Sequence, residues 1–302
     1  MAAALGIADL LEDGPRTSDD LAATTDAHPD ALYRLLRALA SIGVFREDDG
    51  KRFSLTELGD GLRTDAPDSI VDWARYAGRP YARAAWGALT DSVRTGENAF
   101  QLVYGVDVWE YRAQRPEESA IFDRAMAGNL RLQIGALLAA YDFARFGTIV
   151  DVGGGNGALL KALLAAYPDL RGILFDQPHV VAGVDLGARG DVVEGSFFES
   201  VPEGGDAYLL RAILHDWEDP EATAILRTIL QRNGRILVIE RLVGPPNQDS
   251  EAKFSDLNML ISPGGRERTL DEFEALFESA GYQLVGTAPT GGPMHVLEAV
   301  PA

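Results

Sequence analysis

The chain contains no cysteine among its 302 residues. This absence excludes disulfide bonds, thiolate metal sites and a cysteine nucleophile, and no other metal site is expected. It also fits a reducing compartment such as the cytoplasm. A chain of this length buries roughly 75% of the surface that its unfolded form exposes, so its core needs neither disulfides nor a structural metal.

Basic residues are scarce relative to acidic ones, with 27 Lys and Arg against 46 Asp and Glu and a net charge of −19. Duplex nucleic acid is bound by basic surfaces that displace its counterions, so we expect no nucleic-acid partner. No apolar run reaches the roughly 20 residues that span a bilayer. The first segment turns acidic and lacks the basic start and cleavage site of a signal peptide. We therefore expect a cytoplasmic protein with no membrane contact.

The first part of the sequence, up to about residue 140, has the pattern of a small helical domain. Thr17 and Ser18 offer N-cap oxygens for a helix, and leucines recur at helical spacing over residues 32–39. The turn at 48–50 contains Asp-Gly and joins two short apolar segments, which predicts a hairpin. This order of helices and hairpin is the outline of a winged helix. Further helices are expected around Trp109 and over residues 121–134.

The second part, from residue 141, alternates apolar strand-like runs with helical stretches. This alternation predicts a doubly wound, mostly parallel sheet in an α/β domain. Ligands on such sheets bind beyond the carboxyl ends of the strands, where the strand order reverses. At roughly 150 residues per domain the length also fits two domains, 1–140 and 141–302. The expected strands cover residues 148–152, 172–176, 192–197, 207–211, 235–240, 282–287 and 294–300.

A glycine-rich loop, Asp151-Val-Gly-Gly-Gly-Asn-Gly157, follows the first of these strands and leads into a helix. Glycines allow a tight turn and a close approach of the backbone to a ligand, although such a loop alone can be only a turn. Asp176 ends the next strand, where a carboxylate can accept both hydroxyls of a ribose or simply serve a turn. Asp151 would repel a pyrophosphate. An acidic site suits the cationic groups of S-adenosylmethionine better.

Five motifs in order carry a resemblance to a known family: Asp151–Gly157, Phe175–Val180, Leu214-His-Asp-Trp-Glu218, Asp256–Leu260 and Gly265-Arg-Glu-Arg-Thr269. Together they resemble the S-adenosylmethionine-dependent O-methyltransferases of the plant caffeic-acid type, and most of all the bacterial members that modify natural products. The resemblance implies a seven-stranded class I methyltransferase sheet. It also implies an N-terminal winged-helix-like domain through which the protein forms a homodimer.

The resemblance assigns the cofactor site residue by residue. Gly153 and Gly155 would line the methionine portion together with Asp151, and Asp176 with the adjacent Gln177 would hold the ribose. Ser196, where family members often carry Asp, and Phe197 would flank the adenine. Arg211 stands where plant members place a lysine near the cofactor. Two connections, 181–191 and 228–234, are short for the family.

Methylation of a phenol requires a base, and histidine suits that role near neutral pH. Of the four histidines, His215 follows the strand at 207–213 at the ligand-binding edge, and the resemblance implies that it is the base. Glutamates at the positions of Glu240 and Glu267 flank it in the family, although a strand-end residue and a surface ion pair are simpler alternatives. His28 is expected at the surface, while His179 is expected to be structural and His295 to pack in a terminal strand.

An aromatic or polyketide-type acceptor needs apolar pocket walls. Family position suggests five residues, any of which could instead be ordinary core: Phe122, Met126, Asn129, Asn258 and Met259. The acceptor and the hydroxyl that is methylated stay open. We also expect Asp216 to begin a helix and Trp217 to pack in the interior.

Two other functions are compatible with parts of the sequence. A winged-helix regulator explains residues 15–62 but leaves the C-terminal motifs without a role, and Arg34 and Arg37 are too few basic residues for a groove-reading helix. Some relatives of the family bind the cofactor but catalyse hydroxylation or decarboxylation. The presence of His215, Glu240 and Glu267 favours methyl transfer.

Overall fold

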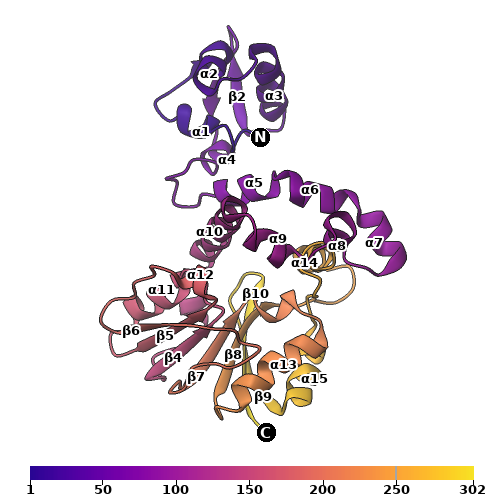
Figure 1. Cartoon of the computed structure of the whole chain (residues 1–302). Coiled ribbons are helices and arrows are strands. Elements are labelled where there is room, and N and C mark those ends of the chain that lie inside the picture. Colours follow the sequence, from indigo (N-terminus) through magenta and orange to yellow (C-terminus); the bar gives the residue numbers. More distant parts are fainter. Residues whose placement is uncertain (249) are drawn as a thin grey trace. The chain divides into compact units, whose positions relative to one another are not determined.

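The computed structural model describes residues 1–248 and 250–302. It divides into two compact units, of which the first contains residues 1–83 and 115–132 and the second contains residues 84–114 and 133–302 (Figure 1). This division differs from the predicted boundary at residue 140. One reason is Asn98, whose side-chain amide donates to the carbonyls of Leu260, at 2.9 Å, and Ser262, at 3.2 Å, and so joins its segment to the α/β unit.

The first unit contains the predicted helices and hairpin. Thr17 caps the second helix, since its Oγ1 accepts a hydrogen bond from the backbone N–H of Asp20 at 3.1 Å. The hairpin turn has positive φ at Gly50 and Lys51. Its sheet has the order β1-β3-β2. The elements are α1 (Ile7–Leu10), β1 (Arg16–Thr17), α2 (Ser18–Thr25), α3 (Pro29–Ser41), β2 (Phe45–Asp48), β3 (Arg52–Leu55), α4 (Glu57–Asp60) and α5 (Val71–Ala77).

Two helices belong to both units. Helix α6 (Pro80–Gly87) begins in the first unit and ends in the second, and α10 (Pro116–Ala140) does the same. The small helices between them lie in the second unit, and they are α7 (Leu89–Thr95), α8 (Ala99–Tyr104) and α9 (Val108–Ala113). The helix expected around Trp109 is therefore α9, and the helix expected over 121–134 lies within α10.

The second unit is built on the predicted seven-stranded sheet. Its order is β6-β5-β4-β7-β8-β10-β9, parallel from β6 to β8, with β10 antiparallel to both of its neighbours. The strands are β4 (Thr148–Val152), β5 (Arg171–Asp176), β6 (Gly190–Glu194), β7 (Ala207–Arg211), β8 (Arg235–Arg241), β9 (Tyr282–Pro289) and β10 (Met294–Pro301). Helices α11 (Ala158–Ala166), α12 (Pro178–Val181), α13 (Asp219–Leu230), α14 (Ser250–Ile261) and α15 (Leu270–Ala280) and the 3-10 turn η1 (Leu214–Asp216) connect them.

The strand predicted at 192–197 is wrong at its end. Strand β6 stops at Glu194, and the next residues turn back, because the N–H groups of Glu199 and Ser200 both donate to the carbonyl of Ser196. The connection before β6 contains only the four-residue helix α12, and residues 191–194 are exposed. The segment noted as short in the sequence therefore carries little helix.

The core and the strand order of the second unit together determine which edge of the sheet can bind a ligand. Val150, Leu210 and Val238 of the central strands are fully buried, and Phe273 and Phe277 of α15 pack in the same cluster. Strand order reverses between β4 and β7, so the crevice for a ligand lies beyond the carboxyl ends of these two strands. In the described ranges, every helix is too short or too polar to cross a membrane.

Candidate active site

His215 lies on the segment that follows β7, at the edge of this crevice. Ala212 has a positive φ of 53°, and the chain then enters the η1 turn, where His215 is 8% exposed. Arg268, which is buried, fixes this turn from outside. It donates from Nη1 to the carbonyl of Leu214 and from Nη2 to the carbonyl of Trp217, each at 2.9 Å. The position of His215 is thus set by backbone contacts.

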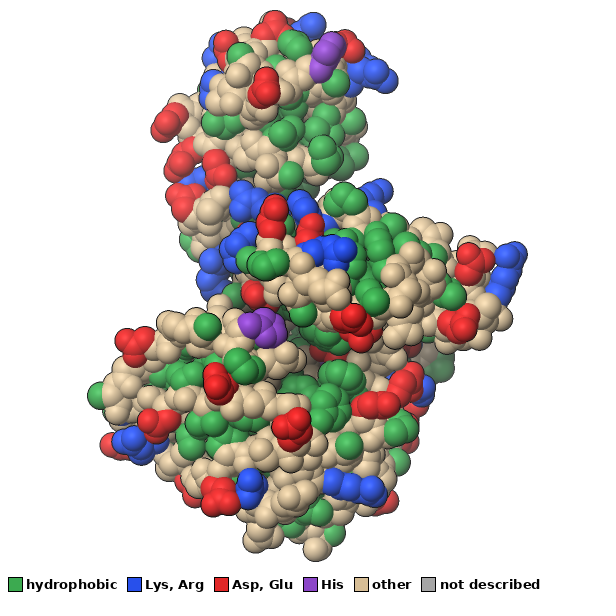
Figure 2. Space-filling model, viewed as in Figure 1, with side chains coloured by type: hydrophobic (Ala, Val, Ile, Leu, Met, Phe, Trp, Pro, Cys, Tyr) green, Lys and Arg blue, Asp and Glu red, His purple; other side chains and the backbone are tan. Residues whose placement is uncertain are grey.

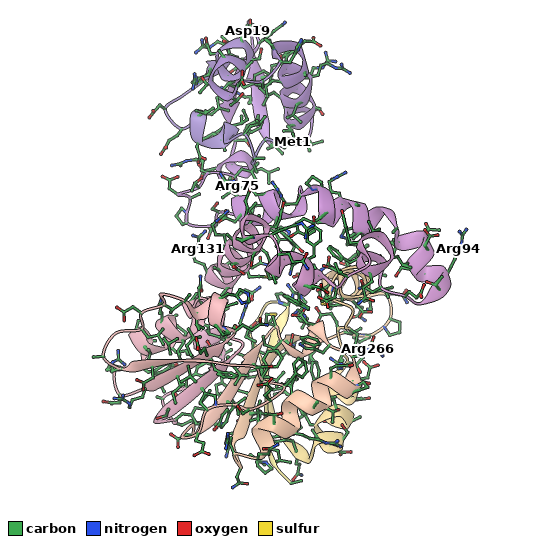
Figure 3. The ribbon with its side chains drawn as sticks, in the orientation of Figure 1. Met1, Asp19, Arg75, Arg94, Arg131 and Arg266 are labelled. Carbon is green, nitrogen blue, oxygen red and sulfur yellow. The ribbon has the colours of Figure 1, made fainter. Side chains whose placement is uncertain are left out.

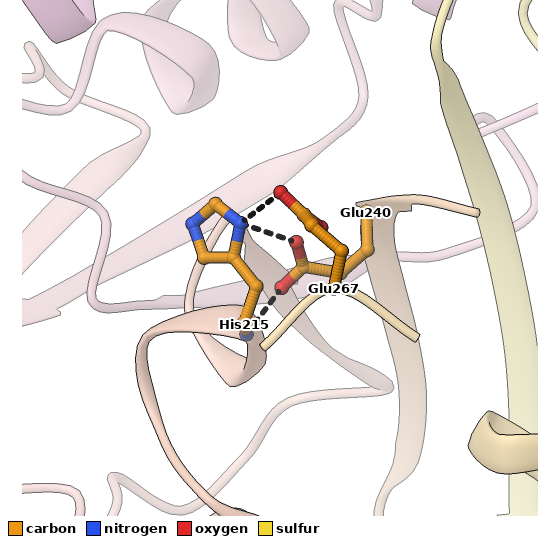
Figure 4. A group of neighbouring side chains, drawn as sticks. All are labelled: His215, Glu240 and Glu267. Carbon is orange, nitrogen blue, oxygen red and sulfur yellow. Dashed lines mark hydrogen bonds and ion pairs between the residues drawn. The ribbon is translucent and has the colours of Figure 1, made fainter. Parts of the chain in front are cut away.

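Both predicted glutamates converge on one ring nitrogen of His215 (Figure 4). Nδ1 lies 3.0 Å from Oε1 of Glu267 and 3.5 Å from Oε2 of Glu240. Backbone hydrogen bonds also hold Glu240, since its Oε1 accepts from the N–H groups of Ile213, at 3.0 Å, and Leu214, at 2.9 Å. These contacts orient the ring with Nδ1 toward the two glutamates and Nε2 away from them.

The simpler role considered for Glu267 is wrong, whereas Glu240 does lie near the end of β8. Glu240 is fully buried and Glu267 is 4% exposed, so Glu267 is not a surface ion-pair partner. Its neighbour Arg266, labelled in Figure 3, pairs with Glu218 instead. Oε1 of Glu267 accepts from the hydroxyl of Ser255 at 2.6 Å, which holds the carboxylate against α14.

Asp216 is a member of the cluster that sequence reasoning missed. It does not begin a helix: it ends η1, and α13 starts at Asp219. Its Oδ1 lies 3.6 Å from Nε2 of His215, on the side opposite the glutamates. Its place directly after the histidine was a signal, since consecutive residues of a tight turn can point into the same crevice.

The charges of this cluster change its proton affinity. Burial alone lowers the pKa of His215, but the carboxylates of Glu240, Asp216 and Glu267 outweigh it and raise that pKa to about 10. Burial raises the pKa of Asp216 to about 6. Burial also raises the pKa of Glu240, whereas the hydrogen bond from His215 overcomes burial and lowers the pKa of Glu267. Apparent pKa values of such a group belong to the cluster as a whole.

Ligand atoms of His215, Glu240 and Glu267 lie within 4.8 Å of one another, a spacing that a metal ion could use. We interpret the arrangement as a hydrogen-bonded cluster. Nδ1 and Oε1 of Glu267 are bonded to each other, and Oε1 of Glu240 is occupied by backbone donors. The carboxylates favour a positive charge on the imidazole, which raises the pKa of His215.

The glycine loop requires glycine for two separate reasons. Gly153, Gly155 and Gly157 have φ of 70°, 60° and 73°, a region that favours glycine. In addition, a Cβ on Gly153 would lie 2.5 Å from a methyl of Ile213, and one on Gly154 would lie 2.6 Å from the carboxylate of Asp151. The loop is therefore packed closely against both the His215 segment and Asp151.

Asp176 closes the other side of this loop. Its Oδ2 accepts from the N–H of Gly155 at 2.8 Å and its Oδ1 from the N–H of Gln177 at 2.7 Å. Burial raises the pKa of Asp176. Gln177 is exposed and precedes α12 as its N-cap residue, without a side-chain capping bond. Asp176 thus lies against the glycine loop, and its role in holding the ribose stays a prediction.

Asp151 and Arg211 supply opposite charges at the same edge. Asp151 lies within β4, 2% exposed, and within the described residues its Oδ2 accepts no hydrogen bond. Burial, with a smaller contribution from Asp176, raises the pKa of Asp151 to about 7. Burial lowers the pKa of Arg211 to about 10, and its Nη2 donates to Oε1 of Gln133 at 2.8 Å. A buried carboxylate oxygen without a partner fits a cationic ligand group.

An aromatic group lies beside the loop. The ring of Phe197 is in van der Waals reach of the position that a Cβ of Gly153 would take, 3.6 Å away, and meets the indole of Trp217 edge-on at 6.2 Å. Trp217 packs in the interior, as predicted. Ser196 precedes Phe197, and its Oγ accepts from the N–H of Phe198 at 3.3 Å.

The predicted acceptor residues fall in both units. Phe122, Met126 and Asn129 lie on the part of α10 in the first unit, where Phe122 packs edge-on against Tyr76 at 5.5 Å. Asn258 and Met259 lie on α14 in the second unit, and Met259 is 6% exposed. Their role in acceptor binding stays a prediction.

The other histidines do not join the cluster. His28 is exposed, as predicted. The structural role expected for His179 is wrong, because it is exposed on α12. His295 is half-buried in β10, paired in register with Glu240 of β8.

The mostly parallel seven-stranded sheet, with its glycine loop after β4, has the fold of the class I methyltransferases, as the solved structures that superpose on it show. Sequence profiles agree: the O-methyltransferase domain matches residues 86–283, and the O-methyltransferase dimerisation domain matches residues 1–65. The chain belongs to the O-methyltransferase family, and its methyl donor is S-adenosylmethionine. The orphaned oxygen of Asp151 and the glycine cradle fit this donor.

Individual relatives cover the whole chain. The phenazine O-methyltransferase PhzM of Lysobacter antibioticus is 40% identical over 311 residues, which span 100% of this chain and 91% of the relative. The O-demethylpuromycin-O-methyltransferase of Streptomyces alboniger is 41% identical over 100% of this chain and 84% of its own. The crystal structure of NcsB1, an O-methyltransferase from neocarzinostatin biosynthesis in complex with S-adenosylmethionine and 2-hydroxy-5-methyl naphthoic acid, superposes with a TM-score of 0.87 at 36% identity, covering 100% and 94% of the two chains.

Proposed function

We propose that this enzyme transfers the methyl group of S-adenosylmethionine to a hydroxyl of a small aromatic or polyketide-type acceptor, with His215 as the general base. The geometry of His215 carries the proposal. Its Nδ1 is engaged by Glu267 and Glu240, which leaves Nε2 as the nitrogen that can accept a proton.

S-adenosylmethionine, when bound, supplies an electrophilic methyl group on a cationic sulfonium. Asp151 balances its positive charge, and Gly153 and Gly155 admit its methionine portion. Asp176 accepts from the ribose hydroxyls beside Gln177, while Ser196 and Phe197 flank the adenine. Arg211 is the cation nearest to this acidic edge and pairs with the carboxylate end of the ligand.

The raised pKa of His215 fits a phenolic acceptor. A phenol has an ordinary pKa of about 10, and the pKa of His215 is raised to about 10. The neutral form of His215, which rising pH makes available, therefore takes a proton from the acceptor oxygen on Nε2 with little change in free energy, and Glu240 and Glu267 stabilise the imidazolium that results. The oxygen then carries the negative charge that methyl transfer needs.

The acceptor class follows from the relatives. The names of these enzymes and their ligands include a phenazine, a demethylpuromycin and a naphthoic acid, all with aromatic rings. The wall residues predicted for such an acceptor are Phe122, Met126, Asn129, Asn258 and Met259. Hydroxylation or decarboxylation on this fold is not favoured, because neither needs a histidine held as a base for a hydroxyl.

We also propose a homodimer formed through the first unit, within the cytoplasm and without nucleic acid. The dimerisation profile covers residues 1–65, and this unit exposes apolar side chains, including Ile42 and Leu58. Figure 2 shows hydrophobic side chains on the visible face of this unit. The net charge of −19 opposes binding to phosphate backbones.

Mass spectrometry tests the proposed reaction. The protein is incubated with S-adenosylmethionine and a panel of phenols, naphthols and hydroxyphenazines. The O-methylated counterpart of each acceptor, whose hydroxyl is blocked, is the negative control. We expect a gain of one methyl group on at least one free hydroxyl and formation of S-adenosylhomocysteine. Cofactor binding with conversion of acceptors only to hydroxylated or decarboxylated products would contradict the proposal.

A further inference from the structure

Arg211 occupies a position between two acidic centres. It ends β7, next to β4 with Asp151 and next to β8 with Glu240. Burial, the largest effect, and Arg241 lower the pKa of Arg211, whereas Glu240 and, more weakly, Asp151 raise it. Electrostatics alone would therefore draw Arg211 toward Glu240. If it turned toward Glu240 it would weaken the carboxylate that supports His215 and leave the cofactor edge without its cation.

One neutral contact decides between these orientations. Oε1 of Gln133, on α10, accepts a hydrogen bond from Nη2 of Arg211 at 2.8 Å. The planar guanidinium carries its donors in a fixed fork, so fixing one terminal nitrogen fixes the plane and the direction of the others. An amide does this without adding charge, so the positive charge of Arg211 stays available for an anionic ligand group.

We propose that Gln133 is a positioning residue of the cofactor site, which holds Arg211 toward the carboxylate of S-adenosylmethionine and away from Glu240. Gln133 acts through Arg211 and needs no contact with the ligand. The inference rests on the role proposed above for Arg211 in the cofactor site. It adds a residue from α10 to a site otherwise formed by the sheet edge and its loops.

Isosteric variants test this role by calorimetry with S-adenosylhomocysteine. Gln133→Met keeps the length of the side chain but removes the acceptor oxygen, and we expect roughly tenfold weaker binding, as for the loss of one hydrogen bond to a charged group. Gln133→Asn keeps the amide but cannot reach Arg211, and the same loss is expected. Gln133→Glu keeps an acceptor oxygen, but its negative charge competes for Arg211, so it should also weaken the binding of S-adenosylhomocysteine. Methylthioadenosine, which lacks the carboxylate, should bind every variant as it binds the wild type.

The matched control is Gln101→Met on α8, where the native side chain is exposed. It should bind as the wild type does. Circular dichroism shows which variants are folded. If Gln133→Met does not fold, Gln133→Asn is used in its place. Wild-type affinity for S-adenosylhomocysteine in the Met or Asn variant, or equal weakening of methylthioadenosine binding, would overturn the role of Gln133. Failure of the wild type itself to bind S-adenosylhomocysteine would instead contradict the proposed function.

Discussion

At the scale of single residues, the site depends on carboxylates placed around one imidazole. Three acids lie within 3.6 Å of the ring nitrogens of His215, and the ring is almost completely buried. Burial disfavours the charged imidazole, but attraction to nearby acids is stronger at low dielectric. The result is a histidine that holds a proton firmly once it has received one, which is what a base for a weakly acidic hydroxyl requires.

Replacing the base tests its role directly. His215→Ala should lower turnover by roughly 10²- to 10⁴-fold, the usual contribution of a general base. The loss should shrink as pH approaches the pKa of the acceptor, because a phenolate needs no base. Affinity for S-adenosylhomocysteine should hardly change. The exposed His28, replaced by alanine, is the control. Equal rates and equal pH profiles in wild type and His215→Ala would show that the histidine only positions the acceptor.

Removing one supporting charge should move the pH profile. Glu267 raises the pKa of His215, and Glu267→Gln keeps an oxygen near Nδ1 but removes the negative charge. The pKa of His215 must then fall, so the unprotonated base is available at lower pH. The acid limb of kcat/KM should shift to lower pH, while kcat falls because the imidazolium is less well stabilised. Steady-state kinetics over pH 5–10.5, about the range in which these groups titrate, measures both effects. A limb that stays in place or moves upward would contradict the assignment.

At the scale of elements, the site is assembled by segments that press against one another. The loop of residues 262–269 carries Glu267 and lies on the η1 turn. A Cβ on Gly265 would lie 2.3 Å from the carbonyl oxygen of His215 and 2.3 Å from the backbone nitrogen of Trp217. Both neighbours are backbone atoms, which cannot rotate away as a side chain can.

Gly265→Ala should therefore displace the catalytic turn. We expect destabilisation of about 1–3 kcal/mol, typical of overpacking, and a loss of turnover larger than the loss of cofactor affinity. Thermal denaturation and single-turnover rates measure the two effects. The control is Gly87→Ala at the end of α6, where an added Cβ meets nothing within 4 Å. Normal turnover in Gly265→Ala would mean that the contact between these segments does not place His215.

The sequence predicted most helices and strands. It predicted less well which side chains of different elements contact one another. Strands and the glycine loop follow from apolar runs and glycines. The two glutamates follow from the resemblance, Glu240 at a strand end and Glu267 in the motif at 265–269. Asp216 was misread, because its side-chain direction depends on η1, which no local pattern indicates. Gln133 was missed for a similar reason: its partner Arg211 is 78 residues away in the chain. The unit boundary also depends on tertiary contacts, such as those of Asn98.

At the scale of the whole molecule, composition and surface favour association of copies. The first unit contains the dimerisation profile and exposes Ile42 and Leu58 at 68% and 60% of their area. Their exposure is compatible with a surface that a second copy covers, and the dimerisation profile points to this unit. Symmetric dimers are the commonest oligomers. A second copy is therefore the expected partner.

Light scattering should accordingly give the mass of two 32.5 kDa chains at micromolar concentration. Ile42→Asp combined with Leu58→Glu should shift the protein to the monomer, because each dimer would bury four unpaired carboxylates. Cofactor affinity should survive, since the proposed cofactor residues belong to the second unit. Val93→Asp is the matched control: Val93 is 67% exposed on α7, outside the dimerisation profile, and its replacement should leave the dimer intact. A wild-type monomer, or a dimer that only Val93→Asp disrupts, would show that the first unit is not the interface.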